Sequence, residues 1–365
     1  MKRAALLASV AGLALSSAVL TSAASASVKL PKSGVESPPA ASLSETGSTL
    51  LYPLWNLWVG GYTQKYSKVT IQTGGTGSGA GISDASNGTA DIGASDAYLA
   101  PSVMQANPGL RNIPLAISAQ LVAYNVTGVV GHLKLSGKVL SQIYQGKIKS
   151  WNNTAIASLN PGVTLPNIPI VTLHRSDSSG DTFLFTQFLS KTDPSGWGSS
   201  IAFNTTVPWP NAPGALGEMG SSGMVSGCKA TPGCIAYVGI SYLTQALQAG
   251  LGYAQLENGK GKFEVPTPAT IGAEAAAFTK KTPSSGTISL IDGQASTGYP
   301  IVNYEYAIVK SGQPSSSKAK AIRSVLEWAV NKNDGNATSY LAQVNFQPLP
   351  SAIVTSSLKQ ILSIK

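Results

Sequence analysis

The sequence has little cysteine, histidine or charge, and each shortage argues against a class of protein. Two cysteines and two histidines in 365 residues leave too few ligands for a zinc site. Charged residues make up only 11%, and the formal net charge is +9. The Lys and Arg residues form no block and no basic helix with interleaved aromatics, which argues against nucleic acid binding. After residue 27, no stretch is apolar enough to cross a bilayer.

The first 26 residues have the pattern of an export signal. Lys2 and Arg3 precede an apolar stretch at residues 4–20, and Ala24-Ser25-Ala26 is a cleavage signal. A transmembrane anchor is the alternative, but this stretch is short and interrupted by serines. We therefore predict a signal peptide at residues 1–26 and a flexible tether at 27–42. No cysteine lies near for a lipid anchor, so we expect a periplasmic, envelope or extracellular protein.

The two cysteines, Cys228 and Cys234, lie close together in Cys-Lys-Ala-Thr-Pro-Gly-Cys. In an exported chain this spacing favours a local disulfide over a metal pair. Because the closed loop is short, the bond would contribute roughly 2 kcal/mol. We interpret it as a clamp on a hairpin or loop, without a chemical role.

Helical and strand-like apolar patterns alternate along the chain, which predicts an α/β protein. Residues Thr49–Tyr66 have helical spacing, with Ser48 as a candidate N-cap. Residues Ile113–Tyr124 are interpreted as a region of paired strands, in which Gln120–Tyr124 is the clearest.

The length is sufficient for two lobes. Strands near 118–125 and 300–309 are well placed to cross between them. We therefore predict a discontinuous first lobe of residues 43–118 and 303–365, and a second lobe of residues 119–302.

The stretch Leu173–Phe183, with sequence LHRSDSSGDTF, is the strongest candidate for a functional site. It is typical of a strand end, a polar turn and the first turn of a helix. Free N–H groups at a helix start attract anions, and the Arg175 fork suits tetrahedral oxyanions. Three further polar loops, around Ser48, Ser78 and Asp96, have a similar character. Together they suggest that several helix ends meet at one anion.

Two other functions fit parts of the sequence less well. Gly75–Ala80 matches a loose dinucleotide-binding pattern, but Asp91 and Asp96 lie too close to serve as its acidic partner. A hydrolase could use His174 as a base, although neighbours on a strand point to opposite faces, so His174 should face away from Arg175.

Seven segments together give a resemblance to the PstS family, the phosphate-binding proteins that supply phosphate ABC importers. They are Gly47–Pro53, Gly77–Gly79, Asp91–Asp96, Ile143–Trp151, Arg175–Gly180, Ile235–Gly239 and Tyr299–Tyr304. They occur in family order over about residues 45–310. The resemblance implies a two-lobed, type II periplasmic-binding-protein fold with a ligand cleft and two crossing strands.

The resemblance also implies a phosphate site. Its ligands would be Thr49, Leu50, Ser78, Asp96, Arg175, Ser179, Gly180 and Asp181. Asp177 would pair with Arg175 and hold its fork. An ionised Asp96 can only accept hydrogen bonds, so it needs a ligand that carries a proton. Phosphate near neutral pH does so, whereas sulfate does not.

Three positions depart from the family pattern. Many relatives have Thr where this chain has Asp181, whose carboxylate could face the ligand as a second acceptor or turn outward. Leu50 replaces a common aromatic, but the expected contact there is main-chain. Gly217–Gly220 differs from the usual form, so no ligand is assigned to it.

We therefore expect an exported phosphate receptor that delivers its ion to the permease subunits of an ABC importer. We expect it to be monomeric, without cofactor or metal and without enzymatic activity. A secreted phosphatase-like protein and a binder of another oxyanion are the alternatives.

Overall fold

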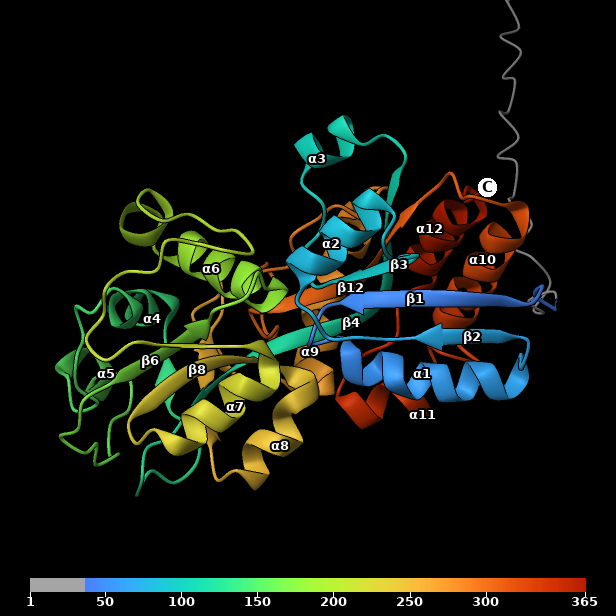
Figure 1. Cartoon of the computed structure of the whole chain (residues 1–365). Coiled ribbons are helices and arrows are strands. Elements are labelled where there is room, and N and C mark those ends of the chain that lie inside the picture. The colour runs from blue at the N-terminus through green and yellow to red at the C-terminus, as the bar shows by residue number, and fades with distance from the viewer. Residues whose placement is uncertain (1–36) are drawn as a thin grey trace, which may run out of the picture. The chain divides into compact units, whose positions relative to one another are not determined.

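The computed structural model describes residues 37–365 (Figure 1). The expected signal peptide, and the tether up to residue 36, lie outside these residues. Strand β1 (Ala41–Gly47) begins at the last two positions of the predicted tether. The Ala41 amide donates to the Lys68 carbonyl at 3.1 Å, and β1 pairs in parallel with β2 (Val69–Gln72). A strand therefore replaces the tether at residues 41 and 42.

One large mixed sheet organises this part of the chain, with strand order β2-β1-β3-β12-β4-β8-β6-β7 and β9 beside β4. Its other strands are β3 (Ile92–Ser95), β4 (Leu110–Tyr124), β6 (Val171–Arg175), β7 (Leu216–Glu218), β8 (Cys234–Gly239), β9 (Gly252–Tyr253) and β12 (Val302–Lys310). A smaller sheet joins β11 (Phe263–Glu264), β10 (Gln255–Glu257) and β5 (Lys134–Leu135). Because β1 and β3 are parallel, their carboxyl ends lie at the same edge.

Helices of ten or more residues pack on strands of the large sheet, and shorter helices lie in the connections. The helices are α1 (Tyr52–Lys65), α2 (Ser78–Asn87), α3 (Pro101–Ala106), α4 (Gly137–Tyr144), α5 (Thr154–Ala157), α6 (Gly180–Thr192), α7 (Gly220–Ala230), α8 (Leu243–Gln248), α9 (Pro268–Phe278), α10 (Ser316–Val330), α11 (Thr338–Leu341) and α12 (Ser351–Leu362). Figure 1 shows α1 and α10 near β1 and β2, and α6 and α7 near β6 and β8. The α/β class predicted from the sequence is confirmed.

Helix α1 shows why the apolar spacing matters. Its buried face carries Leu54, Trp55, Trp58 and Tyr62, as the pattern predicted. The helix begins later than predicted, at Tyr52 with Leu51 as N-cap. The Oγ of Ser48 still accepts the Leu51 amide at 2.9 Å, which fixes the loop before the helix.

The region predicted as paired strands is one continuous strand, β4. Its first part pairs antiparallel with β12, and Gln120–Tyr124 pair with β8. The sequence pattern did not distinguish these arrangements, because a fully buried strand and two adjoining buried strands are both continuously apolar. A register shift between Glu305 and Tyr306 lets β12 follow β4 along this length.

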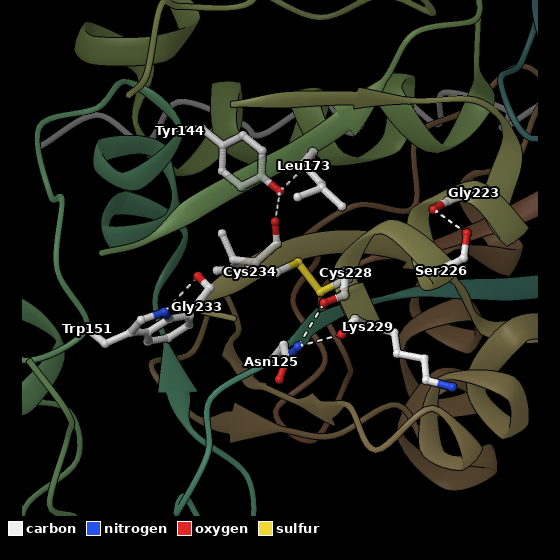
Figure 2. Close-up of a disulfide and its surroundings, with 11 residues drawn as sticks. Asn125, Tyr144, Trp151, Leu173, Gly223, Ser226, Cys228, Lys229, Gly233 and Cys234 are labelled. Atoms are coloured by element: carbon white, nitrogen blue, oxygen red, sulfur yellow. Dashed lines mark hydrogen bonds between the residues drawn. A yellow bond between two sulfur atoms is a disulfide. The ribbon is translucent and has the colours of Figure 1, made fainter. Parts of the chain in front are cut away.

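The disulfide between Cys228 and Cys234 is present and joins two elements (Figure 2). It links the last turn of α7 to the first residue of β8, so of the two predicted alternatives it clamps a loop and not a hairpin. Hydrogen bonds surround it: Asn125 Nδ2 donates to the carbonyls of Cys228 and Lys229, each at 3.0 Å, and Trp151 Nε1 donates to the carbonyl of Gly233 at 2.9 Å. The bond therefore fixes the end of α7 next to the start of β8.

Within residues 37–365, no helix combines the length and the apolar character needed to cross a bilayer.

Candidate functional site

The motif Leu173–Phe183 runs from a strand end into a helix start, as predicted. β6 ends at Arg175, and α6 begins at Gly180. Ser179 is the N-cap, and its Oγ accepts the Thr182 amide at 3.4 Å. Both ends of the turn are buried, since Arg175 is only 3% exposed and Ser179 1%, whereas Ser176 between them is exposed.

Two carboxylates hold the guanidinium of Arg175. Asp177 accepts from Nε at 2.6 Å through Oδ1 and from Nη2 through Oδ2, a two-pronged pair. Nη1 donates to Oδ2 of Asp181 at 3.1 Å. Burial works against both charges of the first pair, but the pairing outweighs it and raises the pKa of Arg175 while lowering that of Asp177. Arg175 is therefore a fixed, charged donor at the end of β6.

The glycine-rich turn before α2 lies directly against this motif. The Gly79 amide donates to the Ser178 carbonyl at 3.0 Å. A Cβ at Gly77 would lie 2.7 Å from Oδ2 of Asp177, and one at Gly79 would overlap Oγ of Ser178. Gly77 also has a φ of +94°, a conformation that glycine adopts readily. The two loops can approach so closely because these residues lack side chains.

Asp96, just after β3, connects several of the predicted site residues. The Ser48 hydroxyl donates to its Oδ1 and the Ser78 hydroxyl to its Oδ2 at 3.3 Å. A Cβ at Gly180 would overlap Oδ2 of Asp96 and Oγ of Ser78, so the start of α6 rests on this pair. Burial, and then the charge of Asp181, raise the pKa of Asp96 to about 6.

The Asp181 carboxylate points inward, which excludes the outward orientation of the two left open by the sequence. It is 1% exposed. Its Oδ1 accepts from Gln120 Nε2 at 2.9 Å, and its Oδ2 accepts from Ser221 Oγ at 3.0 Å and from Arg175. Burial raises the pKa of Asp181, against the opposing effects of Arg175 and these two donors.

Thr49 joins the same network through α7. Its Oγ1 lies 2.8 Å from Oγ of Ser221 and accepts the Ser221 amide at 3.3 Å. The Gly220 amide donates to Oδ1 of Asp177 at 3.2 Å. The start of α7, at the stretch Gly217–Gly220 to which no ligand was assigned from the sequence, is therefore a third helix start beside Arg175.

Leu50 contributes its side chain to the core and not to this polar network. It is fully buried, and a Cβ at Gly239 would lie 2.5 Å from its Cδ1. The Leu50 carbonyl accepts from Ser241 Oγ at 2.7 Å.

His174 lies on the other face of β6 from the Arg175 network. Its ring stacks on Trp209 with centroids 4.9 Å apart. Burial lowers its pKa. The alternation of side chains along the strand, which predicted this separation, keeps the imidazole away from the oxyanion motif.

Four residues of the network were missed from the sequence. They are Gln120, Ser221, Glu305 and, in its role as a partner of Asp96, Ser48. Gln120 and Glu305 carried a signal, because each is a polar residue inside a strongly apolar strand segment. A buried polar side chain of this kind needs a partner. The described residues contain no cluster of three or more His, Cys, Asp or Glu suited to a metal ion.

Known proteins are similar to this chain in both sequence and fold. A model of the PBP superfamily domain matches residues 33–333. The phosphate-binding protein PstS of Methanocaldococcus jannaschii is 32% identical over 351 residues, which cover 90% of this chain and 88% of that protein. The phosphate-binding protein PstS of Xylella fastidiosa is 30% identical over 314 residues, 86% of this chain and 82% of that protein. This chain belongs to the PstS family.

A solved structure gives the fold. The high-affinity periplasmic phosphate-binding protein PfluDING, bound with phosphate, matches with a TM-score of 0.70 and 20% identity, over 87% of this chain and 92% of that one. The PstS family member described here therefore has the periplasmic-binding-protein fold of type II that its sequence led us to expect.

Proposed function

We propose that this protein captures inorganic phosphate outside the cytoplasmic membrane and delivers it to an ABC-type importer. The observation that carries the proposal is the buried acceptor Asp96, placed against the start of α6 and near the fixed donor Arg175. Family membership supports it, since the relatives named above are phosphate-binding proteins.

The proposed ligands act in two ways. Hydroxyl and amide donors would surround the phosphate oxygens, and Arg175 would add a positive charge. The ligand set is Thr49, Leu50 through its amide, Ser78, Asp96, Arg175, Ser179, Gly180 and the amide of Asp181, with Asp177 holding the arginine.

Asp96 would select phosphate over sulfate. With a pKa of about 6, its carboxyl group is mostly ionised at neutral pH and can only accept a hydrogen bond. Phosphate offers an O–H at this point. Sulfate would instead bring two acceptors together without water, which costs several kcal/mol at order of magnitude.

The two-lobe division remains part of the proposal. We place residues 43–118 and 303–365 in one lobe and residues 119–302 in the other, with β4 and β12 crossing between them. On this division Ser78 and Asp96 come from the first lobe and Arg175 and Gly180 from the second. These groups already lie against one another, so entry or release of the ion would require the lobes to separate.

The remaining expectations belong to the same proposal. A signal peptide would export the chain to the periplasm or envelope, where a permease accepts its ion. We propose a monomeric receptor without enzymatic activity or cofactor. The position of His174, stacked on Trp209 behind the strand, supports the absence of a catalytic base at the motif.

Titration calorimetry with phosphate and with sulfate tests the proposal. We expect phosphate to bind and sulfate to bind at least about a hundredfold more weakly, as about 3 kcal/mol per mismatched buried polar contact implies. The D96N variant should lose this preference, while D334N, which removes a carboxylate paired with Lys65 at the surface, should keep it. Equal affinities of the wild type for both ions, or no phosphate binding, would contradict the proposal.

A further inference from the structure

Glu305 lies directly beside Asp96, although neither the motifs nor the proposed ligand set includes it. In the antiparallel pairing of β12 with β3, Tyr306 lies opposite Ser95, so the preceding residue, Glu305, is next to Asp96. Its side chain is completely buried. A glutamate in such a place must be either paired with a cation or protonated.

The hydrogen bonds of Glu305 are divided unequally between its two oxygens. Oε1 accepts from Asn303 Nδ2 at 3.0 Å and contacts the Ser118 hydroxyl, whose single hydrogen is shared with Asn303 Oδ1 at 2.7 Å. Oε2 is buried and receives no hydrogen from any donor in the described part of the chain. A carboxylate oxygen left so would be costly, whereas an oxygen that carries a proton needs an acceptor and not a donor.

That acceptor is at hand. Asp96 lies opposite Glu305 in the pairing of β12 with β3, and each of the two buried carboxyl groups shifts the pKa of the other. Two ionised carboxylates so placed would repel, whereas one proton between them allows a hydrogen bond. Asp96 already accepts from hydroxyl groups at both of its oxygens. The proton therefore belongs to Oε2 of Glu305, and Asp96 is the acceptor.

We propose that Glu305 is a neutral carboxylic acid whose Oε2–H donates to Asp96 and holds it as an ionised acceptor for the phosphate proton. Glu305 is thus a positioning residue for phosphate selection. This inference rests on the proposed function, because it gives Asp96 its task.

The surrounding charges support this distribution of the proton. Arg175 favours the ionised form of Asp96, and Asp181 opposes it. For Glu305, burial and then the charge of Asp96 raise the pKa well above its usual range. The hydrogen bond from Glu305 in turn lowers the pKa of Asp96. One proton on Glu305 therefore serves to keep its neighbour charged.

Two substitutions of Glu305 test whether it acts as a neutral hydrogen-bond donor or as a charged carboxylate. In the E305Q variant the side-chain amide can still donate to Asp96 and accept from Asn303, so we expect phosphate affinity within about threefold of the wild type, with an unchanged pH profile. E305L removes the donor. We expect at least a tenfold loss of affinity at neutral pH, because a hydrogen bond to a charged group is worth about 1.5–3 kcal/mol. The pKa of Asp96 should also rise without its donor. As the pH is lowered, phosphate binding should therefore be lost at a higher pH than in the wild type.

Infrared difference spectra give a readout that does not depend on phosphate. The wild type minus E305Q spectrum near pH 7 should contain the C=O band of a carboxylic acid and no carboxylate band. E274Q is the matched control, because Glu274 is also buried but accepts from the Gly293 amide, away from Asp96. It should leave both the Glu305 band and phosphate binding unchanged.

The outcomes are distinguishable. If the wild type minus E305Q spectrum contains a carboxylate band, Glu305 is ionised and the proposed role is overturned. A change in the phosphate affinity of E305Q beyond tenfold would also overturn it. Because the leucine variant can also fail to fold, E305Q decides the question. Failure of the wild type to bind phosphate would refute the proposed function, while the infrared result would still report whether Glu305 is protonated.

Discussion

At the scale of single residues, Asp181 sets the charge around Arg175. One of its oxygens accepts from both Arg175 and Ser221. This carboxylate therefore competes with any anion for the Nη1 group of the arginine. The family pattern led us to expect Thr here, so Asp181 is an additional carboxyl group at the proposed site.

The D181N variant should bind phosphate more tightly, and most clearly at alkaline pH. Two unit charges 4 Å apart repel by about 1 kcal/mol even in water, so the expected gain is about fivefold or more for the dianion. In the wild type, affinity should rise as pH falls through the second phosphate pKa, because the monoanion is repelled less; D181N should give a flatter profile. Calorimetry between about pH 6 and 8.5 measures both.

The S221A variant is the control for D181N. It removes a hydrogen bond to the same Asp181 oxygen without changing the charge, so its pH profile should stay close to that of the wild type. A tenfold weaker affinity in D181N would mean instead that the carboxylate accepts a phosphate proton, as Asp96 is proposed to do.

The sequence could predict residues of this site where a local pattern carried them. Arg175, Ser179 and Gly180 follow one another at a strand end and a helix start, and the structure places them there. Ser48 and Ser221 reach their carboxylate partners only through tertiary contacts. No local pattern contains such contacts, so these residues could not be found in this way.

At the scale of elements, the contact between α2 and the strands beside it depends on Gly81. A Cβ at this residue would lie 2.5 Å from the Ala94 carbonyl oxygen and 2.8 Å from the Gly47 Cα. These are backbone atoms of β1 and β3, which cannot rotate away. The glycine therefore fixes how closely α2, with Ser78 at its start, approaches the sheet.

The G81A variant should destabilise the protein and also weaken phosphate binding. Overpacking of this kind costs about 1–3 kcal/mol, and it would push Ser78 away from Asp96. Urea unfolding and calorimetry measure the two effects. G60A is the matched control, since an alanine Cβ there meets nothing within 4 Å on the exposed side of α1. Because alanine favours a helix over glycine, G60A should raise the free energy of unfolding by about 0.5–1 kcal/mol. If G81A has the stability and affinity of the wild type, the close packing of α2 is not required.

Elements were predictable from the sequence where apolar spacing was regular. Helix α1 has the expected buried face and ends one residue before its predicted end. Helix α7 was not foreseen, because its sequence GSSGMVSGCKA has poor helix formers and little apolar periodicity. In the structure it packs against β8, to which the disulfide ties its last turn.

At the scale of the whole described body, several carboxyl groups are buried without forming a salt bridge to a Lys or Arg of the described residues. Burial raises the pKa of Glu45 to about 8 and that of Glu274 to about 7, in addition to Asp96 and Glu305. In the unfolded chain such groups lose their protons near pH 4. The folded protein therefore holds more protons than the unfolded one between about pH 5 and 8.

The free energy of unfolding, measured without phosphate, should consequently fall as the pH rises from about 5.5 to 8. We expect a decrease on the order of 2 kcal/mol or more, since each unit of pKa shift corresponds to about 1.4 kcal/mol. Urea unfolding at both pH values tests this. E45Q, which replaces one of these groups by a neutral one, should reduce the slope. A stability that is constant or higher at pH 8 would contradict the expectation.

The two-pronged hold of Asp177 on Arg175 has a consequence for how sites of this kind are recognised. Around one guanidinium stand three carboxyl groups, those of Asp96, Asp177 and Asp181. An electrostatic map would colour this place acidic, although the chain as a whole is basic and we propose that an anion binds here. A search for positively charged pockets would miss this site. A search for a buried arginine surrounded by several carboxyl groups would find it.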